Sequence, residues 1–397
     1  MEEERKLILK MVEEEKISPE DGAKLLKALN QENKTENADA ASVTGTQKQP
    51  ETRTSEEKSD PGVTGPESSN SLSTKVNWEE GNKRFEDWEK EKRKKADATT
   101  SFTDFIDSAI QKIKELDLDF NFGTYQNVHH IFQHKNMEQT ALDISLENGS
   151  IELKPWNEND VKMDCQARVY KGKNQEEARQ EFLNETAFEV DGNLLSFYTR
   201  TKSIKVNAVM YLPRKTYERV QLYTFNGHLK GELIKADSFS GKAVNGSLTI
   251  EAPDHMKFSG ETVNGPIKIS RGKLDIADIK TMNGTIELDT DIRDLEAESV
   301  NGTIDSKLSI SQDARANLSA TTGSIFITIP EHIRTEGQLR TNVGNYNYSL
   351  SDMEITEEKK DFIQKSLRFT SNHAASPRLR LDASTKTGSI SIKPKHV

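Results

Sequence analysis

The sequence predicts a mainly β fold, a β-solenoid in which parallel strands stack in rungs of about 19 residues. Two observations predict it: a regular spacing of glycine pairs, and the same apolar alternation after each pair. The pairs recur at intervals of 19, 19, 19, 18 and 21 residues; they are Asn226-Gly227, Asn245-Gly246, Asn264-Gly265, Asn283-Gly284, Asn301-Gly302 and Thr322-Gly323. Each glycine begins the pattern Gly-x-Φ-x-Φ, where Φ is apolar, as in Ile267 and Ile269 after Gly265. One strand signal per period is typical of stacked repeats in which no single unit buries its own apolar face.

Asn-Gly between apolar alternations is also the strongest short hairpin signal, so a β-sandwich of hairpins is the alternative fold. In a hairpin, residues that flank the turn lie opposite each other and share a face. A three-residue loop pairs Val263 with Ile267, but it then places Glu261 opposite Ile269. Similar mismatches recur at the neighbouring pairs. The sequence therefore favours the solenoid over the sandwich.

The Asn-Gly pairs are predicted to be the structural corners of the solenoid. Glycine adopts positive φ without steric cost, so positive φ is expected at Gly265 and Gly284. The asparagines are expected to stack, because amide side chains can form hydrogen-bonded ladders. The predicted corner residues are Asn245, Gly246, Asn264, Gly265, Asn283, Gly284, Asn301 and Gly302. Parallel stacking also predicts one buried column made of Ile267, Ile286, Ile304 and Ile325.

Composition limits the class of protein. The 397 residues are enough for two or three domains, and 33% hydrophobic with 30% charged residues predicts that part of the chain is disordered. A net charge of −10 argues against nucleic acid as a partner. The single cysteine, Cys165, excludes an internal disulfide framework and fits a reducing compartment. The acidic start and the absence of an 18-residue apolar run predict a cytoplasmic protein, at most peripheral to the inner face of a membrane.

The first part of the chain is predicted to be a helical hairpin on a linker. Residues 1–31 contain two short apolar stripes, with Ser18 as an N-cap and Pro19 at the first helical position of the second helix. So small a hairpin has little core of its own, which predicts a partner surface or self-association. Residues 32–76 are polar and rich in Ser, Thr, Gly and Pro, which indicates a disordered linker.

Residues 77–117 are predicted to be a charged and amphipathic helical segment. A basic run at 90–95 precedes an apolar stripe at helical spacing. The stripe either caps the end of the solenoid or contacts an anionic membrane surface. The cap is preferred, because seven acids balance seven bases within residues 78–97. The residues of this membrane or cap face are Phe102, Phe105, Ile106, Ile110 and Ile113.

Residues 118–397 are predicted to form the β-strand-repeat domain. An early copy of the repeat lies at 142–153, and a helix is expected to interrupt the strands at 173–185. Strand alternation returns at 204–213, and the charged residues 351–363 are expected to form a surface excursion. Degenerate copies of the repeat follow Gly344 and Gly388.

No catalytic or metal-binding motif stands out, so we expect neither an enzyme nor a cofactor. The sequence lacks a phosphate-binding glycine loop, a zinc-protease helix motif and a nucleophile elbow. Two groups of residues are nevertheless candidates. Histidines at suitable spacing can begin a metal site, and carboxylates on neighbouring rungs can converge as in enzymes that cleave polysaccharides. These candidates are His129, His130 and His134, and Asp289, Asp291, Asp294 and Asp305.

The repeats resemble a bacterial β-strand-repeat domain of unknown function that carries the label adhesin. Successive Val-Asn-Gly-x-Ile and Thr-Gly-Ser-Ile units carry the resemblance, with the stretch at 206–213 before them. The N-terminal residues are similar to the SHOCT-like helical hairpin joined to that domain in YvlB- and LiaX-type proteins of Gram-positive bacteria. The resemblance implies a role in the envelope stress response, acting near membrane-bound regulators and, in LiaX-type relatives, sensing antimicrobial peptides. It favours a non-enzymatic scaffold or sensor; a surface adhesin or a carbohydrate-active solenoid enzyme is the alternative.

Overall fold

The structure is a computed structural model that describes residues 98–114, 124–170, 172–361 and 364–395. All of these residues belong to the unit that spans residues 81–397. The predicted hairpin at 1–31, the predicted linker at 32–76 and most of the predicted segment at 77–117 lie outside the described residues. What the structure describes is therefore the β-strand-repeat domain and the helix that precedes it.

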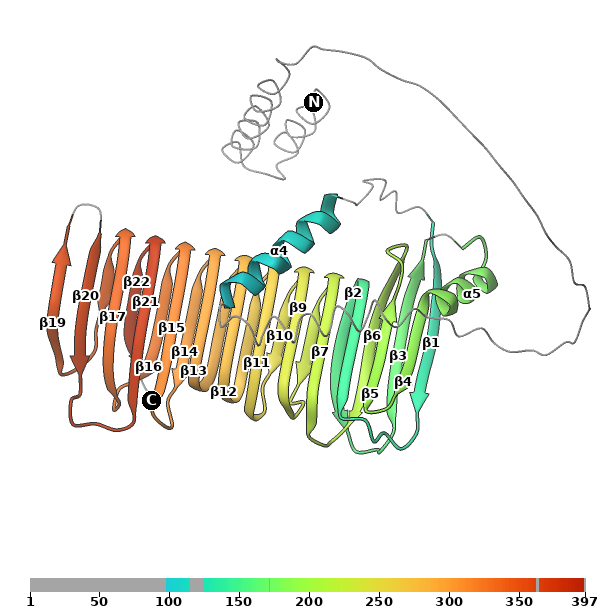
Figure 1. The fold of residues 1–397 in the computed structure, drawn as a ribbon, viewed down its shortest axis with the longest axis horizontal. Helices are drawn as coiled ribbons and strands as arrows, with labels where there is room; N and C mark the ends of the chain where they lie inside the picture. Colours follow the sequence, from blue (N-terminus) through green and yellow to red (C-terminus); the bar gives the residue numbers. More distant parts are fainter. Residues whose placement is uncertain (1–97, 115–123, 171, 362–363, 396–397) are drawn as a thin grey trace, which may run out of the picture. The chain divides into compact units, whose positions relative to one another are not determined.

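The centre of the domain is a regular coil of parallel strands, as the repeat spacing predicts (Figure 1). Its strands are β7 (Tyr217–Asn226), β8 (Leu229–Glu232), β9 (Ala236–Asn245), β10 (Leu248–Glu251), β11 (Asp254–Asn264), β12 (Ile267–Asn283), β13 (Ile286–Asn301), β14 (Ile304–Ser309), β15 (Ala314–Thr322) and β16 (Ile325–Pro330). Neighbouring rungs pair in register, so that Asn264 lies between Asn245 and Asn283. The predicted β-solenoid is confirmed, and the hairpin sandwich is wrong for these rungs.

The predicted apolar column forms the core of the coil. Ile286 lies between Ile267 and Ile304 in the parallel ladders, and Ile304 lies beside Ile325. All four side chains are fully buried. Each rung thus covers the apolar side chain of its neighbour, which a single rung cannot do for itself.

Close approach of neighbouring rungs explains the corner glycines. Gly265 has a φ of 153°, whereas the φ of Gly284 lies outside the left-handed range, so backbone conformation favours glycine at Gly265 and not at Gly284. A Cβ at Gly284 would nevertheless overlap the carbonyl oxygen of Gly265, and a Cβ at Gly265 would overlap that of Gly246. The N–H of Gly284 also donates to the carbonyl oxygen of Asn301, at 3.0 Å. Stacking distance, more than φ, excludes a side chain at these corners.

The N-terminal end of the stack departs from chain order. Its elements are β1 (Gln126–His134), β2 (Ala141–Trp156), β3 (Val161–Val169), α5 (Gln175–Glu185), β4 (Thr186–Asp191), β5 (Leu194–Thr199) and β6 (Ile204–Pro213). β2 is the early repeat copy, and it pairs in parallel with β7 and β8 on one side and with β5 and β6 on the other. Antiparallel strands β1, β3 and β4 complete this end. The predicted helix at 173–185 is confirmed as α5, in which the Asn174 side chain accepts from the Glu177 N–H.

The C-terminal end is also reordered. Its strands are β17 (Arg334–Val343), β18 (Tyr346–Tyr348), β19 (Met353–Lys360), β20 (Lys365–Ser371), β21 (Arg378–Thr387) and β22 (Ile390–Lys395). β21 and β22 lie between the β15–β16 rung and the β17–β18 rung, although they come last in this sequence. β19 and β20 form an antiparallel pair on β17. The surface excursion predicted at 351–363 is therefore wrong for β19, which extends the sheet.

Candidate functional site

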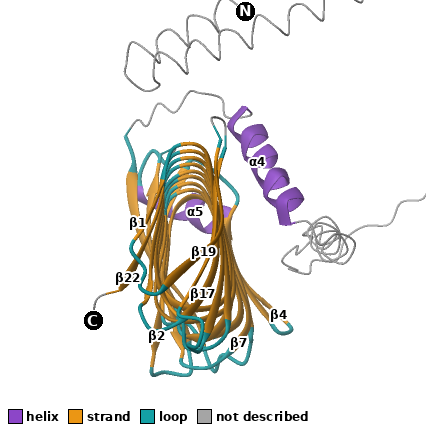
Figure 2. Ribbon diagram, turned by 90° about the vertical axis from the view of Figure 1, so that its left-hand side faces the viewer, coloured by secondary structure: helices purple, strands orange, loops and turns teal. Residues whose placement is uncertain are grey.

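Helix α4 (Ala98–Lys114) lies on the outer surface of the solenoid, beside the strands (Figure 2). It packs against one apolar side chain from each of β7, β9, β11 and β12: Phe225, Val244, Val263 and Met282. We call these four residues the outer column. The preferred sequence interpretation, a cap on the open end of the solenoid, is therefore wrong, because the helix covers the side of four consecutive rungs.

The outer column has a simple origin in the repeat. Each of its residues immediately precedes the asparagine of a corner, as Val263 precedes Asn264. Strand alternation directs these residues away from the core, since their neighbours Thr224, Ala243 and Thr262 point inward and are buried. The recurring apolar residue before Asn-Gly was the sequence signal for this surface. This apolar residue indicates a binding surface only once a covering helix is known, and the period of the strands does not predict that helix.

The helix contacts the outer column through one stripe. Phe105, Ile106 and Ala109 pack against it, and Ala109 is 2% exposed. Phe102 is also buried, with its ring centroid 6.5 Å from that of Phe105. Ile110 lies at the margin and is 37% exposed, and the Ile113 side chain lies outside the described part of the chain. The stripe read from the sequence thus includes the contact residues Phe105 and Ile106 but missed Ala109, because alanine carries little weight in an apolar pattern.

Lys112 joins the helix to the solenoid by polar contacts. Its Nζ donates to Glu147 at 2.8 Å and to the Tyr223 hydroxyl at 3.3 Å. Burial by itself lowers the pKa of Lys112, but the hydrogen bond to Glu147 and the charges of Tyr223 and Glu147 outweigh it, so the pKa is raised. Burial also raises the pKa of the Tyr223 hydroxyl. Lys112 is therefore charged at neutral pH, and its two contacts orient the C-terminal part of α4.

A charged row runs beside the outer column. Lys242, Glu261, Lys280 and Glu298 occupy equivalent positions on successive rungs, so their charges alternate. Lys242 Nζ lies 2.8 Å from Glu261 and 5.1 Å from the centre of the Phe105 ring. The Lys280 side chain is 2% exposed and pairs with Asp278 at 3.2 Å. The surface beneath α4 therefore combines an apolar column with partly buried ion pairs, which suits an amphipathic helix.

The corner asparagines form a ladder next to the outer column. The side-chain amide of each donates to the side-chain oxygen of the preceding one at 2.9 Å, in the order Asn301, Asn283, Asn264, Asn245 and Asn226. The ladder fixes the register of the rungs and hence the spacing of the column side chains. Its role at these corners is structural.

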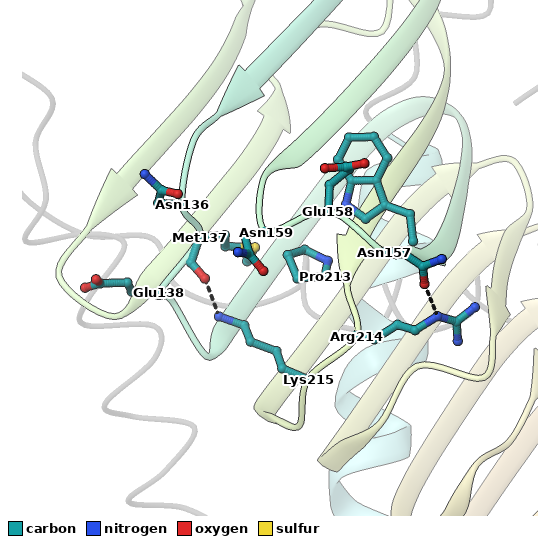
Figure 3. Close-up of a pocket in the computed structure, with 10 residues that line it drawn as sticks. Asn136, Met137, Glu138, Asn157, Glu158, Asn159, Pro213, Arg214 and Lys215 are labelled. Atoms are coloured by element: carbon teal, nitrogen blue, oxygen red, sulfur yellow. Dashed lines mark hydrogen bonds between the residues drawn. The ribbon is translucent and has the colours of Figure 1, made fainter.

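A cleft of about 420 Å³ lies at the N-terminal end of the stack (Figure 3). Three loops form it: the β1–β2 loop, the β2–β3 loop and the β6–β7 loop. Lys215 Nζ donates to the Met137 carbonyl oxygen at 2.7 Å, and Arg214 Nε donates to Asn157 Oδ1 at 3.1 Å. Burial lowers the pKa of Lys215. Trp156 lines the same cleft.

Residues 139–393 match the family described as Toastrack DUF4097. The chain belongs to this family. The Toastrack match covers the strand stack from β2 into β22, and residues 3–34 match a SHOCT-like domain. The chain is 34% identical over 290 residues to "Uncharacterized protein YvlB" of Bacillus subtilis (strain 168). This alignment covers 73% of the present chain and 80% of the relative. The resemblance read from the repeats and the N-terminal residues is confirmed.

Two solved structures also align with this Toastrack chain. A "putative cell adhesion protein" from Clostridium sporogenes ATCC 15579 has 12% identity and a TM-score of 0.23, covering 68% of this chain and 100% of that one. A "putative adhesin" (BF0245) from Bacteroides fragilis NCTC 9343 has 9% identity and a TM-score of 0.25, covering 68% and 97%. At these TM-scores the likeness carries no argument about fold detail or function.

The candidate chemical residues of the Toastrack domain do not gather into one site. His129 and His130 neighbour each other on β1, but His129 Nε2 contacts Asp164 at 2.8 Å while the His130 ring packs on Phe132. No group of three or more metal-ligating side chains occurs among the described residues. Cys165 is fully buried, and burial raises the pKa of its thiol, so it is not poised as a nucleophile.

The four candidate aspartates are divided between β13, with Asp289, Asp291 and Asp294, and β14, with Asp305. Asp289 pairs in the ladder with Lys307, and Asp305 pairs with Glu287. Asp291 Oδ1 accepts from the Ser311 N–H at 3.2 Å, and Asp294 pairs in the ladder with Arg315.

Among the residues that the structure describes, no helix has the length and apolar character needed to span a membrane.

Proposed function

We propose that this protein is a non-enzymatic scaffold or sensor of the bacterial cell-envelope stress response, and that it binds a protein or peptide partner through the outer column. The stress role rests on the resemblance to YvlB- and LiaX-type proteins, and the observation that carries partner binding is the position of α4. An amphipathic helix already occupies an apolar surface on the solenoid, with its stripe at Phe105, Ile106 and Ala109 facing that surface. Helix-in-groove binding is a recurring mode of peptide recognition. The SHOCT-like residues supply a second contact for a partner.

The contact between α4 and the solenoid is small enough to be reversible. Its apolar part consists of one stripe of a 17-residue helix. Its ion pair, Lys112 with Glu147, has side chains 37% and 20% exposed, and pairs of this kind contribute about 0–1 kcal/mol. A ligand that binds the uncovered column shifts the population toward the released state by its differential affinity.

The partner is a second amphipathic helix, supplied by a membrane-bound regulator or by an antimicrobial peptide. Such a helix needs apolar side chains at the spacing of Phe105, Ile106 and Ala109 to replace α4 on the outer column. Released α4 in turn has an apolar stripe that can enter the headgroup layer of an anionic membrane. Partner binding and attachment to the inner face of the membrane thus support each other.

A labelled peptide of residues 98–114 is expected to bind the full chain at least about tenfold more tightly when α4 is displaced, because occupancy of the column by α4 lowers the apparent affinity. Phe105→Asp together with Ala109→Asp in the protein displaces the helix without changing the solenoid. Fluorescence polarisation measures the binding. The further change Val244→Glu, in the column itself, is expected to abolish it. Equal peptide affinity for the parent and the displaced variant contradicts the proposal.

The parent protein is expected to sediment in part with anionic vesicles at low salt, and Phe105→Glu together with Ile113→Glu is expected to abolish that fraction. Charges on the apolar stripe make its transfer into the headgroup layer unfavourable. Ser108→Glu is the matched control, since Ser108 is exposed on the docked helix. If the parent stays in the supernatant, membrane attachment through α4 is contradicted, and the peptide experiment alone decides whether α4 regulates binding to the outer column.

A further inference from the structure

The cleft at the N-terminal end is an addition to the repeat (Figure 3). Regular rungs turn within a few residues, as at Ala252 and Pro253 between β10 and β11. Here the β2–β3 loop at 157–160 and the β1–β2 loop stand beside the β6–β7 loop. At about 420 Å³ the cleft falls within the size range of small-molecule sites. Stacking of rungs does not require such a cleft, so the repeat by itself does not account for it.

Hydrogen bonds between the three loops hold the cleft open in one shape. The Met137 N–H donates to the Asn159 carbonyl oxygen at 2.8 Å, and the Met137 carbonyl oxygen accepts from Lys215 at 2.7 Å. Arg214 is fixed on Asn157, and the buried Tyr217 hydroxyl donates to the Pro213 carbonyl oxygen at 3.0 Å. A site whose walls are already fixed binds with a smaller entropic cost.

Trp156 gives the cleft an aromatic wall. Its Nε1–H donates to the Asp160 carbonyl oxygen at 2.7 Å, and its ring centroid lies 5.6 Å from that of Tyr211. Since its polar atom is occupied, the partly exposed ring offers an apolar face. A fixed aromatic face of this kind packs against the C–H groups of a flat ligand.

Planar polar groups surround this wall. Asn159 and Glu158 from one loop and Arg214 from another line the cleft and are exposed. Amide, carboxylate and guanidinium groups can each form paired hydrogen bonds with two neighbouring hydroxyls. Two acidic and two basic side chains line the cleft, Glu138 and Glu158 with Arg214 and Lys215, so their charges balance and do not select a compact anion such as phosphate. The polar lining disfavours an acyl chain.

We infer that this cleft binds a saccharide, with Trp156 against a sugar face and Asn159, Glu158 and Arg214 on its hydroxyls. The site is separate from the outer column and does not depend on the release of α4. Binding there brings no chemical step: it attaches the solenoid to a glycan.

Tryptophan fluorescence tests the inference directly. The chain has three tryptophans, so Trp78→Phe with Trp88→Phe leaves Trp156 as the single reporter. The probes are maltotriose, chitotriose and trigalacturonic acid, with inorganic phosphate as the anion control. At least one trisaccharide is expected to change the emission of Trp156 in a saturable way, and phosphate is expected not to. If none of the three trisaccharides does so, or if phosphate does, the inference is overturned.

Two variants in the single-tryptophan background separate binding from folding. Glu158→Ala with Asn159→Ala removes hydroxyl-binding groups and is expected to weaken binding about tenfold, the effect of one or two lost hydrogen bonds. Asn347→Ala, at an exposed asparagine on β18, is the matched control and is expected to bind like its parent. Circular dichroism melting shows that both variants fold. Unchanged saccharide affinity in the double variant refutes the assignment of this cleft.

Discussion

Gly284→Val is expected to lower the free energy of unfolding by about 3 kcal/mol, the upper end of what overpacking typically costs, because the added side chain overlaps backbone atoms. A Cβ at this corner overlaps the carbonyl oxygen of Gly265, and it also lies 3.0 Å from Thr281 Oγ1. Neither neighbour can withdraw: the Gly265 corner is held by the ladder, and Thr281 is fully buried. Urea unfolding followed by circular dichroism measures the loss.

Glu287→Gln is the matched control for this substitution. Glu287 is an exposed residue three positions further along the chain, and its ion pair with Lys268 has side chains 57% and 48% exposed. Its loss is expected to change the free energy of unfolding by no more than about 0.5 kcal/mol. Equal unfolding midpoints for the two variants contradict the view that close stacking of the corners requires glycine.

Truncation after Pro377 is expected to disrupt the C-terminal half of the solenoid. It removes β21 and β22, an internal rung whose Leu379, Leu381, Ile390 and Ile392 are buried. Each such side chain contributes about 1.5–3 kcal/mol, so the loss approaches the total stability of about 5–15 kcal/mol typical of a domain. Both interfaces of the rung are lost together, since stability in a repeat stack comes from contacts between neighbours.

Limited proteolysis with mass spectrometry measures the effect of truncation. Cleavage is expected within β17–β20, because β17 loses its parallel partner β21 and β18 loses β22. A chain that ends at residue 395 keeps both strands and is expected to resist cleavage like the parent. A truncated chain with intact β17–β20 and an unchanged melting temperature contradicts this account of the rung order.

Much of the fold could be predicted from the sequence because the repeat is local. The spacing of the glycine pairs gives the rungs, and the alternation after each glycine gives the buried column at Ile267 and Ile286. The helix at α5 follows from its own composition. In each case the signal lies within about one rung, where strand geometry relates residue order directly to position in space.

The order of the end rungs could not be predicted in the same way. The patterns after Gly344 and Gly388 are equivalent as strand signals, so either fits either place in the stack. In the structure, Ile390 and Ile392 are buried in the internal rung, whereas Tyr346 and Tyr348 on β18 are partly exposed or exposed. The place of a rung among similar rungs depends on pairing between strands that are distant in the sequence, and the period of the repeat does not specify that pairing.

The candidate surface was predictable only in part. The stripe of α4 was readable from helical spacing, but its place on the outer column was not. An amphipathic pattern predicts that one face of the helix is buried, but it does not identify the surface that buries it. The cleft was missed altogether, because Trp156 and Arg214 come from separate loops that only the fold brings together.

The inserted position of β21 and β22 has a consequence for biosynthesis. Strands β17 to β20 leave the ribosome before β21 and β22, yet the later pair occupies the place between β15–β16 and β17–β18. The rungs therefore cannot assemble in the order of translation. Until residues 378–395 are synthesised, strands β15 to β18 lack their partners β21 and β22. Unpaired sheet edges favour aggregation and recognition by chaperones. Production of this protein is thus expected to depend on how quickly translation supplies residues 378–395.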